Sequence, residues 1–290
     1  MSKGKLFLIL SAFLYGVLPT LAAIAYRGGV NGITLTFLRS FISVPILYII
    51  IKADKKSLHL TKKQLRSIIN LSIFGGALPI LLLYLSYNYI STGLATTLHF
   101  IYPLVIIFAS AVIYREKISR VTLASALFVT IGIFMFSDIS TSASKIGIVF
   151  ALISGVLYSF YVIYIDRSGL DRMDFIVLTF YIMLFMSGVI FLFGIAVGGL
   201  NFDISPVSWV IANLISLVTT LGAMPLLQIG IRYEGASTAG ILSTVEPITT
   251  IILGAIFLGE IINTSQILGG ALIITGVLLS QHKQKIKISR

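Results

Sequence analysis

Residues 91–119 read STGLATTLHFIYPLVIIFASAVIYREKIS, an apolar run with a histidine and a proline near its middle and a basic cluster at its end. A related run, GASTAGILSTVEPITTIILGAIFLGEIIN, occupies residues 235–263 and places Pro247 where the first run has Pro103. About twenty apolar residues are enough for a helix to cross the hydrocarbon core of a bilayer. Each run therefore predicts a membrane-spanning helix, and their similarity predicts two related halves.

The composition is that of a membrane protein. Of the 290 residues 57% are apolar and only 11% are charged, whereas a soluble domain carries about 25% charged residues. Cysteine is absent, which excludes disulfides and thiolate metal sites. No nucleotide-binding loop or metal-ligand spacing is present, so we expect no cofactor and no metal. The apolar run that starts at Leu6 lacks a small-residue cleavage pattern, so we expect no cleaved signal.

Ten segments are long and apolar enough to span a bilayer. The third and fourth are separated only by residues 91–93, where we expect a tight turn, since one helix of that combined length would overshoot the membrane. The chain is therefore predicted to be an all-α integral membrane protein. The expected spans are residues 4–26, 33–51, 66–90, 91–114, 118–138, 145–166, 174–196, 206–230, 235–258 and 262–281.

The basic residues predict the orientation of the chain. With ten spans, all but three of the 21 lysines and arginines fall on the side of the two termini, the exceptions being Arg27, Arg39 and Lys145. Because cytoplasmic loops carry an excess of positive charge, both termini are predicted to be cytoplasmic, in the cell membrane. The net charge of +11 is then explained by loops that face anionic lipid, and no nucleic-acid partner is expected.

The two halves carry further matching motifs at a nearly constant offset. SAFLY ending at Tyr15 matches SGVLY ending at Tyr158, and GALP at 76–79 matches GAMP at 222–225. Each half has five spans, and an odd number means that the second half enters the membrane from the opposite side. We expect two inverted five-helix repeats, residues 1–140 and 145–282, followed by a basic cytoplasmic tail, 283–290. Secondary transporters use this plan, with the substrate site near the midplane.

With these motifs the chain resembles the EamA-like branch of the drug/metabolite transporter superfamily. The shared features are the inverted halves, the proline in spans four and nine, the Glu-Lys-Ile or Glu-Ile-Ile that follows, and Gly132 and Gly276 in the closing helices. The first half has Tyr102 before its proline where the family usually has glutamate. The resemblance implies a carrier that exports or imports amino acids, nucleotide precursors, sugars or other small metabolites.

Three ionisable residues lie well inside spans, namely Arg39, His99 and Glu246. A charged residue at this depth costs at least about 2.5–3.5 kcal/mol, so each needs a partner or a cavity. Glu246 is predicted to accept a proton or to anchor a substrate amine; the alternative is a protonated carboxyl that holds helices together. His99 is a proton carrier or a hydrogen-bonded core histidine. Arg39 binds a substrate carboxylate, pairs structurally, or extends to the headgroups.

Aromatic and amide side chains form a second group of candidates. Deep tyrosines can stack on a planar or cationic substrate, although packing and an interfacial belt are the alternatives. A polar stripe in the eighth span is a cavity lining or a set of helix-to-helix hydrogen bonds. The candidates are Tyr15, Tyr84, Tyr87, Asn88, Tyr102, Tyr158, Tyr161, Asn213 and Gln228.

Prolines and glutamates mark bends and helix ends. We expect bends at Pro79, Pro103, Pro225 and Pro247, about which helix bundles can rock. Glu116 and Glu260 follow the fourth and ninth spans at opposite faces of the membrane, where a carboxylate favours the start of the next helix. Their predicted role is structural, and a gate is the alternative.

These observations predict a secondary transporter that works by alternating access. The substrate is predicted to be a small polar or aromatic metabolite, an amino acid or a related compound, exported either by facilitated or by proton-coupled transport. The alternatives are an importer of a small amine, a nucleobase or a sugar-type metabolite, and a channel or receptor. An intramembrane enzyme is not predicted, because no nucleophile motif or metal spacing is present. The expected partners are the substrate, membrane lipid and protons, and the protein is a monomer or a homodimer.

Overall fold

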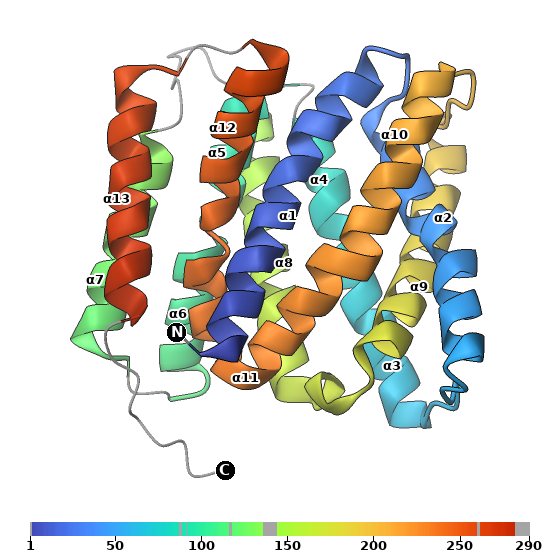
Figure 1. Cartoon of the computed structure of the whole chain (residues 1–290), viewed down its shortest axis with the longest axis horizontal. Helices are drawn as coiled ribbons and strands as arrows, with labels where there is room; N and C mark the ends of the chain where they lie inside the picture. Colours follow the sequence, from blue (N-terminus) through green and yellow to red (C-terminus); the bar gives the residue numbers. More distant parts are fainter. Residues whose placement is uncertain are drawn as a thin grey trace.

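The computed structural model of the protein describes residues 2–86, 89–90, 92–115, 118–135, 144–259 and 262–281, with the side chains of 92, 93 and 281 left out. Within these ranges the chain is helical and crosses the bundle ten times (Figure 1). Seven helical segments are long and apolar enough to span a membrane, and three shorter apolar helices complete the set. The prediction of ten transmembrane helices in two inverted five-helix halves is confirmed.

The first half contains the helices up to residue 134. They are α1 (Lys3–Tyr26), α2 (Gly32–Ala53), α3 (Lys62–Asn70), the π-helix η1 (Leu71–Ala77), α4 (Leu78–Ser86), α5 (Thr92–His99), α6 (Tyr102–Val112) and α7 (Arg120–Phe134).

The second half repeats this order. It consists of α8 (Lys145–Ser168), the short 3-10 helix η2 (Leu170–Arg172), α9 (Phe175–Ala196), α10 (Pro206–Leu217), the π-helix η3 (Val218–Ala223), α11 (Met224–Leu242), α12 (Val245–Leu258) and α13 (Thr264–Gln281).

Helix capping sets several boundaries that apolar content alone misplaces. The third span begins at Lys62, four residues before its predicted start, because Thr61 and Gln64 form a capping box. The fifth begins at Arg120 after the Ser119 cap and ends at Phe134, short of the predicted 138. Residues 136–143, like 87–88, 91, 116–117, 260–261 and 282–290, lie outside the described part of the chain.

The third and eighth spans contain π-helices at matching places. η1 ends just before Leu78-Pro79, and η3 ends just before Met224-Pro225. A proline lacks the N–H that would close the preceding helical turn, and single π-helical turns occur where the regular hydrogen-bond ladder is disturbed. The same local feature in both halves follows from the same repeated sequence.

The fourth and ninth spans are broken near their middles, where the sequence predicted only bends. α5 ends at His99 and α6 begins at Tyr102, while α11 ends at Leu242 and α12 begins at Val245. Each proline falls in the first turn of the second half-helix, where a missing N–H costs nothing because that turn has no intrahelical partner. The positive ends of two helix dipoles therefore lie inside the bundle.

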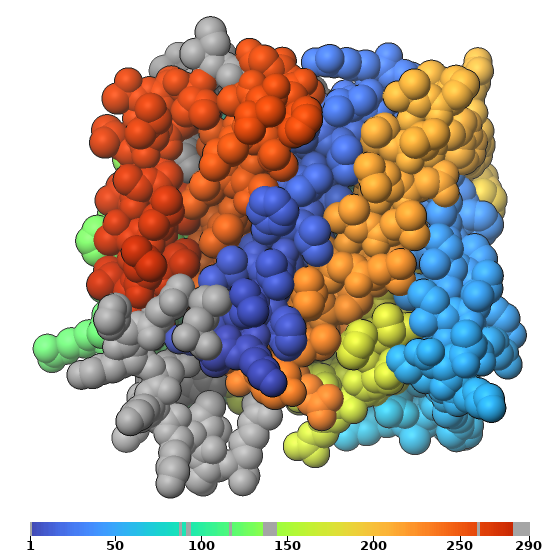
Figure 2. Space-filling model, in the orientation of Figure 1, coloured from blue at the N-terminus to red at the C-terminus, as the bar shows by residue number. Residues whose placement is uncertain are grey.

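The two halves are interleaved, since each first helix packs against the broken helix of the other half. α1 packs against α11 and α12, and α8 packs against α4, α5 and α6. Figure 2 shows α1 filling the space between α12 and α11 on one face. A Cβ at Gly16 would lie 2.6 Å from the Glu246 carbonyl oxygen, and one at Gly155 would overlap the His99 carbonyl oxygen. Glycine is required at both contacts.

The remaining helices pair at the two edges of the bundle. α7 packs against α13 and α2 packs against α9, as Figure 1 also shows. The outer surface carries exposed large apolar side chains, among them Phe108, Leu192 and Val210. Such a surface is suited to lipid, while the interior holds an apolar core together with buried polar side chains such as Ser40 and Thr220.

Candidate functional site

Three aromatic side chains meet where the broken fourth span contacts α8. The rings of Tyr102 and Tyr158 lie 4.8 Å apart in an edge-to-face arrangement. The His99 ring lies 5.4 Å from that of Tyr158 and 5.8 Å from that of Tyr102. Tyr102 is almost fully buried, whereas His99 and Tyr158 keep part of their surface accessible. The structure thus brings together three residues that the sequence singled out from two different spans.

The hydrogen bonds of His99 assign its tautomer. Its Nδ1 lies 2.8 Å from the Ser154 hydroxyl oxygen, and that hydroxyl donates its one hydrogen to the Ala151 carbonyl at 2.6 Å. The hydroxyl must therefore accept from Nδ1–H, which leaves Nε2 of the neutral ring as an acceptor. Ser154 is the first residue of the repeated SGVLY motif. The sequence did not predict it as a site residue, because only the fold shows that it contacts His99.

Glu246 brings an acidic group to the same cluster. It lies in the first turn of α12, whose dipole favours a negative charge. The carboxyl group interacts electrostatically with Arg39 from α2, with Tyr15 from α1 and with Tyr102 and Tyr158. Glu246, Arg39 and Tyr15 are all half-buried. We call Tyr15, Arg39, His99, Tyr102, Tyr158 and Glu246 the central group.

Two donors of the central group are buried without a hydrogen-bond partner among the described residues. They are the Tyr102 hydroxyl and Nε of Arg39. Tyr102 approaches Ser243 closely enough to interact with it electrostatically, but the geometry falls short of a hydrogen bond. Ser243 occupies in the second half the place that His99 has in the first. Because buried polar groups are normally paired, these donors point to a bound group that accepts hydrogen bonds.

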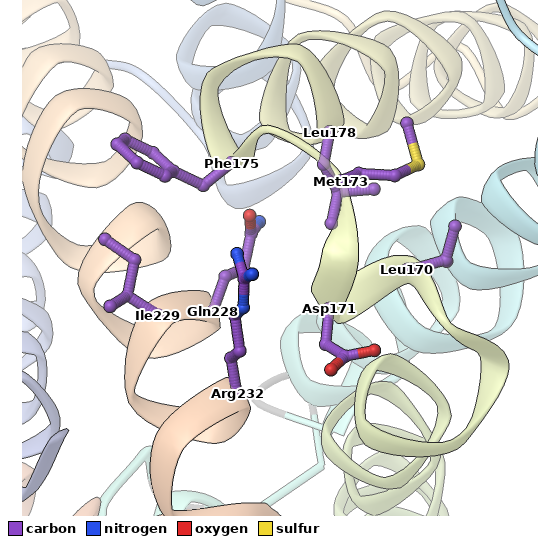
Figure 3. Close-up of a pocket in the computed structure, with 8 residues that line it drawn as sticks. All are labelled: Leu170, Asp171, Met173, Phe175, Leu178, Gln228, Ile229 and Arg232. Atoms are coloured by element: carbon purple, nitrogen blue, oxygen red, sulfur yellow. The ribbon is translucent and has the colours of Figure 1, made fainter.

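Tyr161 and Gln228 lie beside the central group. The Tyr161 ring is stacked on that of Tyr158 at 5.9 Å. Gln228 donates from Nε2 to the Thr179 hydroxyl at 3.1 Å, and it lines a small cavity between α11 and the α8–α9 connection (Figure 3). Thr179 is a further residue that sequence reasoning missed.

Other predicted site residues lie elsewhere. Asn213 is exposed and donates to the Trp209 carbonyl of its own helix at 2.8 Å. Tyr84 packs its ring against Gly32 at the start of α2. Tyr87, Asn88, Glu116 and Glu260 are outside the described residues. In the part of the chain that the structure covers, no three histidine, aspartate or glutamate side chains gather in a way that could hold a metal ion.

A polar, aromatic group between two broken helices of an inverted repeat is the arrangement of a secondary transporter. The model of the EamA-like transporter family matches residues 2–138 and again residues 145–281. The chain therefore belongs to the EamA-like transporter family, and it is a multi-pass membrane transporter.

Similar proteins agree with this assignment. The uncharacterized transporter YcbK of Bacillus subtilis (strain 168) is 27% identical over 279 residues, which cover 92% of this chain and 89% of that protein. An uncharacterized transporter of Archaeoglobus fulgidus is 24% identical over 280 residues, 97% of each chain. A protein of known crystal structure superposes with a TM-score of 0.83 over 96% of this chain and 97% of its own, at 18% identity, so the two share the fold.

Proposed function

We propose that this transporter carries a small zwitterionic metabolite of the amino-acid class by alternating access. The observation that supports this best is the electrostatic interaction between one acidic and one basic side chain, Glu246 and Arg39, beside a group of aromatic rings. Inverted-repeat carriers bind their substrate at this level of the membrane, and a zwitterion presents a charge to each side chain.

The surroundings of Glu246 suit the amine. A carboxylate attracts an ammonium group, and the rings of Tyr15, Tyr102 and Tyr158 offer π faces to the same cation. The Tyr158 ring contacts both Tyr102 and His99, so its position is fixed from two sides. An aromatic side chain on the substrate can stack on the same rings.

The carboxylate of the substrate is matched by donors. Arg39 supplies a charge and an unpaired Nε, and Tyr102 supplies an unpaired hydroxyl. The N-terminal ends of α6 and α12 both lie at the breaks, and a helix N-terminus favours a negative group. Binding a carboxylate would pair groups that are otherwise buried alone.

Glu246 also supports coupling to protons. Taking a charged carboxylate out of water is costly even near an arginine, so we infer that Glu246 holds either a proton or the substrate amine. The proton and the substrate amine compete for Glu246. This competition couples proton influx to substrate efflux across the cell membrane. In this scheme His99, tied to Ser154 through Nδ1, anchors the broken helix and does not carry the proton.

The charge distribution supports a cytoplasmic position for both termini. Ser2 is hydrogen-bonded to Glu234 and Lys56 is paired with Asp174, so the start of α1, the α2–α3 loop and the start of α9 lie at one end of the bundle. Most of the lysines and arginines belong to this end, which the positive-inside rule assigns to the cytoplasm.

Counterflow in proteoliposomes tests the function. Vesicles loaded with unlabelled amino acids should take up labelled amino acids saturably, and amines or nucleobases should compete poorly. Glu246→Gln should abolish the pH dependence of flux, while Asp203→Asn, which removes a carboxylate from an exposed loop, should change neither flux nor its pH dependence. Wild-type flux and pH dependence in Glu246→Gln would remove the proposed role of this carboxylate, and non-saturable flux would indicate a pore.

A further inference from the structure

Gln228 and Tyr161 form a polar contact that the central group does not use. Each is only 3% exposed. The Tyr161 hydroxyl faces the Gln228 amide, but the geometry falls short of a hydrogen bond, and both the hydroxyl and Oε1 of Gln228 are buried without a partner among the described residues. Each of these two neighbouring side chains thus carries a buried polar atom without a partner in the described part of the chain.

The contact lies between the central group and the cavity of Figure 3. On one side, the Tyr161 ring is stacked on Tyr158, a member of the central group, with the two planes 6° apart. On the other side, Gln228 lines the cavity together with Arg232 and Asp171. In Figure 3 Gln228 and Arg232 extend from α11 along one side of the cavity, and Asp171 and Met173 lie across from them. Polar groups therefore continue from the bundle end to the central group.

The polar pair Tyr161 and Gln228 has no polar counterpart in the first half of the chain. The offset that aligns Tyr158 with Tyr15 places Leu18 at the position of Tyr161. The offset that aligns Pro225 with Pro79 places Leu82 at the position of Gln228. Two inverted halves would give similar contacts at the two ends of the bundle. Here one end has a tyrosine and a glutamine where the other has two leucines.

We propose that the cavity is the vestibule of the transport route at this end, and that Gln228 and Tyr161 are the gate that closes it from the central group. This inference rests on the proposed function. When the gate opens, the substrate amine donates to Oε1 of Gln228 and the substrate carboxylate accepts from the Tyr161 hydroxyl. The gate therefore selects for a zwitterion as it passes, whereas the leucine pair at the opposite end makes no such contact.

The absence of cysteine allows a direct test by thiol labelling. Single cysteines are placed at Met173, in the vestibule, and at Asp203, in the loop at the other end, and are exposed to a membrane-impermeant cationic methanethiosulfonate in inside-out and right-side-out vesicles. Ser243→Cys, a nearly isosteric change beside Tyr102 of the central group, reports on the space behind the gate. We expect Met173→Cys to label only from the vestibule end and Asp203→Cys only from the other.

The gate residue is then removed in the same background. Adding Gln228→Ala to Ser243→Cys should raise the labelling rate from the vestibule end by about tenfold or more, and adding Leu82→Ala, the matched control, should leave that rate unchanged. Gln228→Ser, which keeps a short polar side chain, is the second variant, with size-exclusion profiles confirming that each is folded. Equal rates in the Gln228→Ala, Gln228→Ser and parent backgrounds would overturn the gate, as would faster labelling from the Asp203 end.

This test is separate from the test of function, because labelling needs no substrate. If amino acids are not carried but the labelling pattern is as expected, the vestibule and the gate are supported and the proposed substrate class is wrong. If amino-acid counterflow is observed and Gln228→Ala does not change labelling, the proposed function is supported and the gate is wrong.

Discussion

Tyr102 and Glu246 occupy matching positions in the two halves, each directly before a proline in the first turn of a half-helix, and their side chains interact electrostatically. The two halves thus have similar backbones at this point but different side chains: Tyr102 provides a hydroxyl donor and Glu246 provides a carboxylate. The asymmetry gives the central group one end suited to an anion and another suited to a cation.

The hydroxyl of Tyr102 should matter for binding and not for folding. It is buried without a hydrogen-bond partner, and removing an unpaired buried group costs little, so Tyr102→Phe should change the free energy of unfolding by less than about 1 kcal/mol. A hydrogen bond to a charged group contributes about 1.5–3 kcal/mol, so KM for amino-acid flux should rise roughly tenfold or more. Tyr164→Phe, outside the central group, is the control for both measurements, and an unchanged KM in Tyr102→Phe would contradict this role.

The close contacts of the first helices predict a strong response to a single methyl group. Gly16→Ala places a Cβ within 2.6 Å of the Glu246 carbonyl oxygen, and overpacking of this kind costs typically about 1–3 kcal/mol. Gly188→Ala is the matched control, because nothing lies within 4 Å of a Cβ there, and alanine in a helix is favoured over glycine by about 1 kcal/mol. Thermal unfolding in detergent should show opposite shifts. A Gly16→Ala protein as stable as the parent would mean that α1 and α12 separate easily.

The two ends of the bundle should differ in their response to salt and pH. At one end Lys56 pairs with Asp174, the cap of α9, at 3.1 Å, and at the other Asn31, the cap of α2, donates to the Gly199 carbonyl at 2.8 Å. Partial burial lowers the pKa of Lys56, but its hydrogen bonds and ion pairs with Asp174 and Asp54 outweigh this and raise it.

The sign of the pH effect follows from the raised pKa. The stabilisation by Lys56 is fully present below the unfolded value of about 10.4 and is lost as the pH rises through the higher folded value. Lys56→Met should cost about 0.2–1 kcal/mol at low salt and less at high salt. The cost of Asn31→Ala should not depend on salt. Equal salt dependence of the two variants would show that Lys56 does not act through its charge.

Much of the fold was predictable because hydrophobic length and loop charge are local properties of the chain. The breaks at Phe100 and Ser243 were predicted only as bends. A proline in the sequence indicates that one backbone N–H donor is missing, but it does not indicate how many neighbouring residues leave the helix. The polar stripe of Asn213, Ser216 and Thr220 was expected as a cavity lining or as helix-to-helix hydrogen bonds. Ser216 is buried and its hydroxyl bonds to that of Ser43 in α2 at 2.7 Å, whereas Asn213 is exposed, because helical spacing does not say which residues of a stripe face lipid. Ser154 and Thr179 became visible only when their partners from other spans were in place.

Substitutions of His99 can distinguish a role in anchoring the broken helix from a role in proton transfer. Its Nδ1–H donates to Ser154, and an asparagine in its place puts an amide nitrogen near the position of Nδ1, whereas a glutamine puts one near Nε2. His99→Asn should therefore keep the hydrogen bond, the melting temperature and the pH dependence of flux. His99→Gln should lose the bond, which contributes about 0.5–1.5 kcal/mol, and should melt a few degrees lower. If flux in His99→Asn no longer responds to pH while the protein melts normally, the histidine carries the proton and Glu246 only binds the amine.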